Sequence, residues 1–323
     1  MDNIFEVSFS DTLSIMSAKQ GRNIAMVGAS GNIGSRTLAA ILETGVHTVT
    51  AISRGESNAT FPAGVAVKKG DYADESFLVN ALQKQDVLVI QLGFMVTGQQ
   101  IPLIHAAAKA GVKYILPTEF GSDPYAPFAT VFPMLAEKKK YRDLVEELGM
   151  SWIAVVNNPW FDWSLKQGNW GINVKEKKAV LYKGAEAKFN TTTLKQVGEG
   201  VAALLSLPDA QLETFKNKPV YLSSFETTQK EMLDSVFRAT GGKEGDWNIV
   251  VRDATDVIAE GREEVAKGNP FAFVYEFYIA HMQDGFGGDY HEKAAKDAEI
   301  LGLKAGNLDD AVKAVVQEVA TGN

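Results

Sequence analysis

Three glycines spaced three residues apart join an apolar run to a helical pattern near the start of the chain. Gly28, Gly31 and Gly34 directly follow the apolar run 24–27 and open the pattern 32–44. The first glycine permits a tight strand-to-helix turn, the second lets the backbone approach a pyrophosphate, and the third lets helix and strand pack closely. The alternative is an ordinary glycine-rich turn. We expect a dinucleotide to bind here, in contact with Gly28, Ser30, Gly31, Asn32, Ile33 and Gly34.

Beyond this loop, short apolar runs alternate with helical patterns, which is typical of a parallel sheet covered by helices on both faces. The predicted strands are 24–27, 48–52, 65–68, 87–92, 112–116 and 152–156. The predicted helices between them are 32–44, 74–84, 99–110 and 134–148. The fold class is therefore α/β, with a doubly wound parallel sheet. Ligands of such sheets bind outside the carboxyl ends of the strands.

The alternation stops after Asn158, where aromatic residues and glycines gather. We expect an N-terminal extension over 1–21, a Rossmann domain over 22–160 and a smaller, mainly α+β substrate domain over 161–323. The segment 190–222, with a helical pattern followed by a short strand, is expected to pack with the Rossmann domain.

Composition excludes several classes of protein. The 323 residues are 46% hydrophobic and 22% charged, as in an average globular protein. The net charge of −8 makes a nucleic-acid partner improbable, because nucleic-acid affinity depends on lysine and arginine. The absence of cysteine excludes disulfides and thiolate chemistry and favours a cytoplasmic location. No apolar run approaches the roughly 20 residues that span a bilayer, so we expect no membrane segment.

The end of the second predicted strand indicates which dinucleotide binds. An acidic residue there would bind the ribose 2′-hydroxyl of NAD, whereas this chain has Ser53 and Arg54. Arginine suits a 2′-phosphate through charge-assisted hydrogen bonds, so Arg54 favours NADP(H). Alternatively, Arg54 is a charged loop residue that is exposed to solvent and binds no ligand. Asp71, after the third strand, either borders the adenine or caps the following turn.

One lysine of the helical pattern 134–148 falls on its apolar stripe. Lys139 and Lys140 align with acidic residues, whereas Lys138 aligns with Met134, Tyr141, Val145 and Leu148. A partly desolvated lysine has a lowered pKa and can transfer a proton near neutral pH. Alternatively, its stem buries methylenes while the ammonium reaches water. We expect Lys138 to be catalytic and to contact the cofactor.

Three segments carry a family pattern: the glycine loop 28–34, the segment AAKAGVKYILPTEFG at 107–121, and KKKYR at 138–142. Together they resemble the isoflavone reductase-like branch of the atypical short-chain dehydrogenases, within the NmrA-like group. The resemblance runs from Arg22 to about Leu207. It implies an NADP-binding Rossmann domain, a smaller substrate domain, and a Lys-x-x-x-Arg pair matched by Lys138 and Arg142. We also expect Gly93, Phe120 and Asn158 to contact the cofactor.

Aromatic residues after the sixth strand are the candidate substrate pocket. The family commonly reads Ser-Asn-x-Phe there, whereas this chain reads Asn157-Asn158-Pro159-Trp160, which predicts a reshaped pocket wall. We expect Trp160, Phe161, Trp163 and the loop residue Phe286 to contact the substrate. The alternative for the aromatic cluster is the core of the small domain.

The four histidines show no metal-ligand spacing, and we assign no metal. His281 could supply a second proton donor, although a surface position is the preferred interpretation. The sequence thus predicts an NADPH-dependent reductase that transfers hydride to a small aromatic or heterocyclic metabolite, with Lys138 as proton donor or acceptor. A redox-neutral isomerase or cyclase is one alternative, and a non-catalytic NADP-sensing regulator is another.

Overall fold

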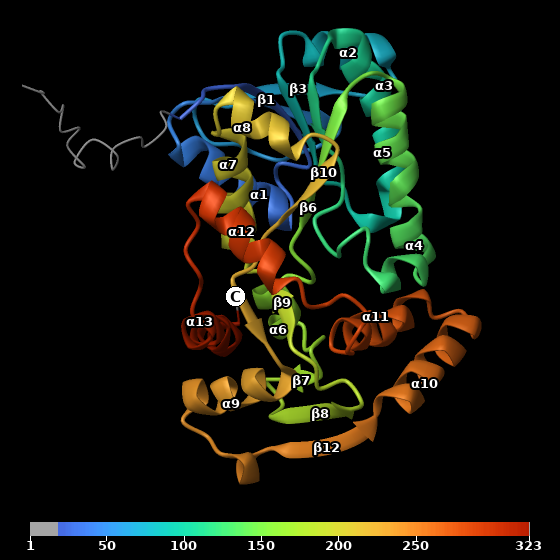
Figure 1. Ribbon diagram of the computed structural model, residues 1–323, viewed down its shortest axis with the longest axis vertical. Helices are drawn as coiled ribbons and strands as arrows, with labels where there is room; N and C mark the ends of the chain where they lie inside the picture. The colour runs from blue at the N-terminus through green and yellow to red at the C-terminus, as the bar shows by residue number, and fades with distance from the viewer. Residues whose placement is uncertain (1–18, 323) are drawn as a thin grey trace, which may run out of the picture.

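The computed structural model describes residues 19–322, so residues 1–18 of the predicted N-terminal extension lie outside the described part. A seven-stranded sheet has the order β10-β6-β5-β4-β1-β2-β3, and all its pairings are parallel (Figure 1). Its strands are β1 (Asn23–Val27), β2 (Thr48–Arg54), β3 (Ala66–Gly70), β4 (Val87–Ile90), β5 (Tyr114–Leu116), β6 (Ser151–Val156) and β10 (Lys218–Tyr221).

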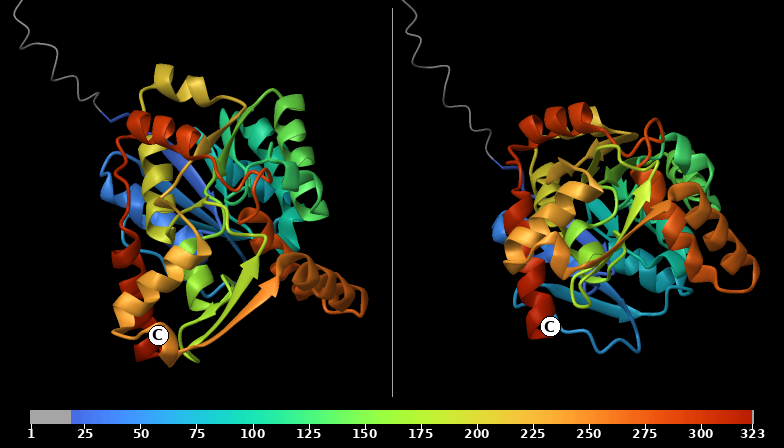
Figure 2. Two further views of the ribbon diagram at one scale, coloured as in Figure 1. Left: turned by 60° about the horizontal axis from the view of Figure 1, so that its bottom comes forward. Right: turned by 90° about the horizontal axis from the view of Figure 1, so that it is seen from below.

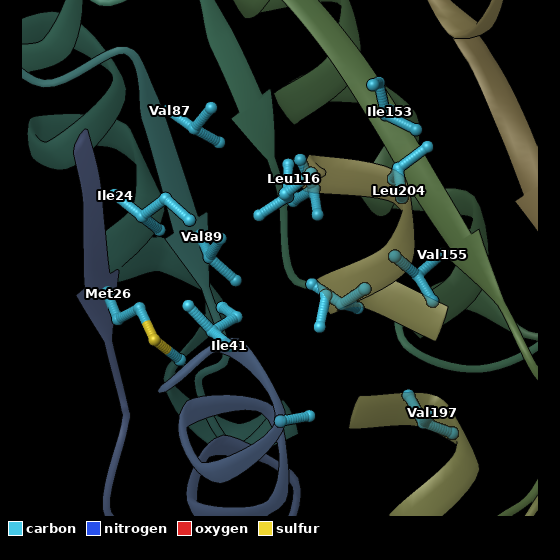
Figure 3. Close-up of a cluster of buried hydrophobic side chains, with 14 of the residues drawn as sticks. Ile24, Met26, Ile41, Val87, Val89, Leu116, Ile153, Val155, Val197 and Leu204 are labelled. Carbon is cyan, nitrogen blue, oxygen red and sulfur yellow. The ribbon is translucent and has the colours of Figure 1, made fainter. Parts of the chain in front are cut away.

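Helices cover both faces of this sheet. Successive residues of a strand point to opposite faces, and in β1 Ile24 and Met26 join one core while Ala25 and Val27 join another. The first core includes Ile41 of α1 (Asn32–Glu43) and Val197 of α7 (Leu194–Leu205), and Figure 3 shows these side chains together. The second core lies under α2 (Glu75–Leu82), α3 (Gln100–Ala110) and α5 (Lys138–Glu147). The predicted doubly wound α/β fold is confirmed.

After the first strands of a second, smaller part, the chain returns to the large sheet with α7 and β10. Helix α7 packs against α1, and β10 pairs with β6 at the edge of the sheet. Thr193 caps α7, because its hydroxyl accepts a hydrogen bond from the backbone N–H of Gln196. Near the start of the described chain, the N–H of Gln20 donates to the carbonyl of Ser206 at 2.9 Å.

A second, smaller part lies below the large sheet in Figure 1 and comes forward in Figure 2. One of its sheets has the order β12-β8-β7, and a two-stranded sheet pairs β11 with β9. Its strands are β7 (Ile172–Asn173), β8 (Lys178–Lys183), β9 (Phe189–Thr191), β11 (Phe225–Thr227) and β12 (Asn248–Asp253). Its helices are α6 (Phe161–Lys166), α9 (Gln229–Thr240), α10 (Ala254–Ala266), α11 (Phe273–His281) and α13 (Leu308–Thr321).

The predicted helix 134–148 is divided in the structure. Helix α4 (Pro133–Ala136) precedes α5, and Glu137 separates the two. The remaining elements are α8 (Asp209–Leu212), α12 (His291–Leu301) and the short 3₁₀ helices η2 (Phe94–Gln99), η3 (Pro127–Thr130), η4 (Glu213–Phe215), η5 (Glu244–Asp246) and η6 (Pro270–Ala272). Within residues 19–322, no helix has the length and apolar character needed to cross a membrane.

Candidate active site

Two adjoining cavities lie at the carboxyl ends of the parallel strands. The smaller, of about 250 Å³, lies over the glycine loop, and the larger, of about 420 Å³, is lined by residues of both the large and the small part. Gln91, Leu92 and Gly93, which follow β4, line both cavities. The two spaces therefore form one continuous site, which extends from the glycine loop after β1 to the space between the two parts of the molecule.

The glycine loop has the close packing that its sequence predicts. Gly28 has φ of +81°, and a Cβ there would collide with the backbone carbonyl of Gln91. A Cβ on Gly34 would collide with the carbonyl of Gly28. Gly31 provides no side-chain cap for α1, so the first N–H groups of that helix stay available to a ligand. Ser30 and Gly31 line the smaller cavity, and Asn32 and Ile33 line the larger.

Arg54 lines the smaller cavity, with its side chain 63% exposed. Its guanidinium is 3.4 Å from the carboxylate of Glu56, a pair open to solvent on both sides. Tyr72 also lines this cavity, and its hydroxyl donates to the carbonyl of Ile52. Asp71 instead caps the next turn, because its carboxylate accepts a hydrogen bond of 2.9 Å from the N–H of Ala73. Of the two roles considered for Asp71, the geometry corresponds to the cap.

Lys138 lies on the wall of the larger cavity, as its position on the apolar stripe of α5 predicts. Its side chain is only 16% exposed, whereas those of Lys139 and Lys140 are 70% and 49% exposed. The Nζ atom donates to the carbonyl of Glu119 at 2.6 Å. Burial lowers the pKa of Lys138, although the Glu119 carboxylate acts in the opposite direction. Lys138 is thus a partly desolvated amine next to a ligand-sized space.

Glu119 is a functional candidate that the sequence analysis did not identify. Its carboxylate is 3% exposed, accepts a hydrogen bond from Arg142, and lies 3.7 Å from the Nζ atom of Lys138. The three side chains form a buried cluster with one negative and two positive groups. The only sequence signal was the position of Glu119 in the family segment 107–121.

Phe120 and Asn158 have left-handed backbone conformations where their segments enter the larger cavity, with φ of +34° and +52°. The amide nitrogen of Asn158 donates to the carbonyls of Asn190 and Gly288, each at 2.8 Å. Asn158 therefore holds two distant segments against the cavity wall. Its Oδ1 atom is buried without a partner among the described residues.

The aromatic cluster after β6 is divided between cavity and core. Trp160 and Trp163 line the larger cavity, with ring centroids 6.1 Å apart in a T-shaped arrangement. Phe161 and Trp170 are fully buried in the core of the small part, where Phe161 packs against Phe225. The prediction that Phe161 contacts the substrate is therefore wrong, because this side chain points into the core.

Phe286 also requires correction. This residue is 37% exposed and lies outside the cavity lining, although its carbonyl accepts a hydrogen bond from the N–H of Phe128. Helix α11 supplies the aromatic wall instead, and the sequence analysis did not identify this helix as part of the site. Its contributions to the cavity are Phe273, Val274, Phe277 and Tyr278.

His281 is buried rather than on the surface, so the preferred interpretation of this histidine is wrong. The ring is 0% exposed and packs between Phe128 and Phe277, with centroid distances of 4.4 and 4.8 Å. Its Nε2 atom is 3.0 Å from the hydroxyl of Ser122, a residue that lines the larger cavity. Burial lowers the pKa of His281 to about 4, which makes the ring neutral at pH 7.

Comparisons with known proteins agree with this architecture. The chain is 27% identical to the oxidoreductase aprR of Aspergillus flavus over 302 residues, which cover 91% of this chain and 98% of that protein. The crystal structure of isoflavone reductase superposes with a TM-score of 0.72 at 21% identity, covering 91% of this chain and 99% of that one. The NADPH complex of leucoanthocyanidin reductase from Vitis vinifera gives a TM-score of 0.73 at 17% identity, with coverages of 91% and 99%.

A family model described as the NmrA-like family matches residues 20–244, which include the glycine loop, Lys138, Arg142 and Asn158. The resemblance that the sequence segments indicated is therefore confirmed, and the chain belongs to the NmrA-like family.

Proposed function

We propose that this chain is an NADPH-dependent reductase of small aromatic or heterocyclic metabolites. The observation that carries the proposal is the position of Lys138, a partly desolvated amine on the wall of a cavity that continues from the glycine loop. A non-catalytic regulator would have no use for a proton-transfer group at this place. The relative in Aspergillus flavus, which aligns over nearly its whole length, is named an oxidoreductase.

The residues around the two cavities fit NADPH. The glycine loop packs closely, since a Cβ at Gly28 or Gly34 would collide with the backbone, and its residues Ser30 and Gly31 line the smaller cavity, where the pyrophosphate would bind. The open N–H groups at the start of α1 favour an anion at that point. Arg54, which lines the smaller cavity, would bind the 2′-phosphate. Gly93, Phe120 and Asn158 would contact the nicotinamide end, because they line the larger cavity.

When bound, NADPH supplies the hydride. The chain's own contribution is to hold the substrate and to move a proton. Lys138 in its ammonium form would give its proton to the substrate oxygen or nitrogen on which negative charge develops. The neutral amine then regains a proton from solvent. Glu119 stabilises the ammonium form, since its carboxylate lies 3.7 Å away.

The walls of the larger cavity favour an aromatic substrate. Trp160, Trp163, Phe273 and Phe277 line it, together with a few polar groups, and such a composition is typical of small-molecule sites. Its volume of about 420 Å³ is within the range of small-molecule sites, and the nicotinamide end of the cofactor would take up part of it. Isoflavone reductase and leucoanthocyanidin reductase, two structurally similar proteins, have names that refer to aromatic compounds.

Product analysis tests this proposal. The purified protein is incubated with NADPH and a panel of aromatic carbonyl compounds and enones, and products are identified by mass spectrometry. We expect a reduced product, and we expect Lys138→Ala to lower turnover roughly 10²- to 10⁴-fold with little change in NADPH affinity. Lys139→Ala, which removes an exposed lysine of the same helix, is the matched control. Equal effects of the two substitutions, or no reduced product from any compound, would contradict the proposal.

A further inference from the structure

A serine and a histidine that are distant in sequence form a buried pair beside the larger cavity. Ser122 follows the loop segment that carries Glu119, and it lines the cavity while remaining 5% exposed. Its Oγ atom is 3.0 Å from the Nε2 atom of His281, at the end of α11. This pair plays no part in the function proposed above, although it adjoins the same space.

The direction of the hydrogen bonds in this pair follows from its third member. The Nδ1 atom of His281 is 2.7 Å from the backbone carbonyl of Phe277. A carbonyl only accepts hydrogen bonds, so Nδ1 carries the proton of the neutral ring. Nε2 then has a lone pair and no proton, and the Ser122 hydroxyl must donate to it.

His281 acts here as a positioning residue and not as a base. Phe128 and Phe277 pack against the ring, with centroids at 4.4 and 4.8 Å, and the ring has no exposed surface. An imidazolium in this apolar surrounding would be costly, in line with the lowered pKa of His281. The ring stays neutral and fixes the orientation of the Ser122 hydroxyl.

Ser122 can act only as a hydrogen-bond acceptor towards a ligand. Its single proton is used in the bond to His281, so its oxygen offers only lone pairs to any further partner. Lys138 lies on the same wall, because its Nζ atom is 4.0 Å from the position that a Cβ would occupy on Gly121. The site therefore offers a hydrogen-bond donor at Lys138 and, one residue beyond Gly121, an obligatory acceptor at Ser122.

We propose that Ser122 is a specificity residue that accepts a hydrogen bond from a hydroxyl group of the substrate, so that the preferred substrates are hydroxylated aromatic compounds. This inference rests on the proposed function, because it names the substrate class of the same site. The substrate carries an oxygen that receives a proton from Lys138 and a free hydroxyl that reaches Ser122. Ligands without such a hydroxyl leave the lone pairs of the Ser122 oxygen desolvated and without a hydrogen-bond donor, which weakens their binding.

Binding of defined probes tests the inference without requiring turnover. The probes are 4-hydroxychalcone and 2′-hydroxychalcone, with unsubstituted chalcone as the comparison, and calorimetry is performed on the full chain with NADP⁺ present. We expect at least one hydroxylated probe to bind about tenfold more tightly than chalcone. Ser122→Ala should reduce that preference to less than about twofold, and Ser122→Thr, which keeps a hydroxyl, should retain most of it.

Ser235→Ala is the matched control, because Ser235 is another buried serine, on α9, whose hydroxyl bonds to Asp309 and which lies outside the cavity lining. This variant should keep the preference of the wild type. The inference is overturned if the wild type shows no preference for either hydroxylated probe, or if Ser122→Ala keeps it. Bound probes that are not reduced by NADPH would count against the reductase proposal alone, whereas reduction without any hydroxyl preference would count against Ser122 alone.

A spectroscopic measurement tests the hydrogen-bond direction and does not need a folded Ser122 variant. In protein with ¹⁵N-labelled histidine, the His281 signals are identified by their loss in His281→Phe. Two-bond ¹H–¹⁵N correlation spectra at pH 7 should show the tautomer protonated at Nδ1. A tautomer protonated at Nε2 would make the Ser122 oxygen the acceptor within the pair and would overturn the inference.

Discussion

Arg142 donates a hydrogen bond to the carboxylate of Glu119, and both side chains are almost completely buried. Lys138 contacts the same residue from the cavity side, through the backbone carbonyl at 2.6 Å. One buried carboxylate thus compensates two cations in the wall of the candidate active site. Removal of one partner from a buried ion pair is strongly destabilising, because the remaining charge has neither solvent nor counter-ion.

Glu119→Gln should therefore lower the free energy of unfolding by about 3 kcal/mol. The measurement is urea denaturation at pH 7 followed by circular dichroism. Asp143→Asn is the matched control, since it breaks the exposed pair between Asp143 and Lys139 on the same helix and should cost less than about 1 kcal/mol. Similar small losses in both variants would show that Glu119 contributes no buried charge pair.

The same substitution should change the pH dependence of turnover. The carboxylate of Glu119 favours the charged form of Lys138, so its replacement by glutamine lowers the pKa of Lys138 further. A proton donor loses activity above its own pKa, and the alkaline limb of the turnover profile should move to lower pH. Asp143→Asn should leave that limb in place. A limb that moves to higher pH, or stays fixed in Glu119→Gln, would contradict the assignment of Lys138 as the donor.

Arg54 should determine the preference for NADPH over NADH. A charge-assisted hydrogen bond to the 2′-phosphate contributes about 1.5 to 3 kcal/mol, which corresponds to roughly 10- to 100-fold in affinity. Calorimetry on Arg54→Asp should show that preference narrowed or reversed. Lys68→Asp makes the same change of charge on the neighbouring strand β3, outside the cavity lining, and should keep the preference. Equal affinities for both dinucleotides in the wild type would refute the role of Arg54.

Most of the first half of the fold could be predicted from the sequence, because strands such as β1 and β4 are short, apolar and followed by a helical pattern. The strands of the small part could not. Strand β12 lies at an edge, and its Val250 and Val251 are 46% and 64% exposed, so no buried alternation marks it. Its partner β8 begins and ends with exposed lysines, and Lys178 and Asn248, which lie opposite each other in the pair, are far apart in the chain.

In the candidate site, features formed by residues close together in the sequence could be predicted, and features formed by distant residues could not. Lys138 could be identified because a helical stripe is a local property. The pair of Ser122 and His281 joins residues 159 positions apart, and no local pattern links them. Trp160 and Phe161 could not be separated, because Trp160 is the extended residue just before α6 and Phe161 is the first residue of that helix, and only the packed structure shows which one faces the cavity.

The divided aromatic cluster gives opposite predictions for neighbouring residues. Trp160→Ala should raise the KM for an aromatic substrate roughly 2- to 10-fold, because it removes a stacking surface worth about 0.5 to 1.5 kcal/mol. Phe161→Ala should instead lower the free energy of unfolding by about 3 kcal/mol or more, since it leaves a cavity in the core. Steady-state kinetics and urea denaturation of both variants check the division. If only Trp160→Ala lowers the stability, Trp160 and not Phe161 is the residue that belongs to the core.

His281 should make the protein less stable in acid. Its pKa is about 4 in the folded protein, against an ordinary value of 6.5, so the unfolded chain binds more protons between these two values. The contribution of neutral His281 to the free energy of unfolding is fully present above pH 6.5 and is lost as the pH falls towards 4. The full effect is about 3 kcal/mol. The pKa of His47 is also lowered to about 4, mainly by burial, and this histidine therefore contributes in the same direction.

His281→Phe keeps an aromatic ring between Phe128 and Phe277 and removes the titrating group. The variant is expected to be less stable at pH 7, because Ser122 and the Phe277 carbonyl lose a partner. Its loss of stability between pH 7 and pH 4.5 should nevertheless be smaller than that of the wild type by roughly 2 to 3 kcal/mol. His105→Phe, at an exposed position of α3, is the matched control. If wild type and His281→Phe lose the same stability over this interval, His281 is not buried in its neutral form.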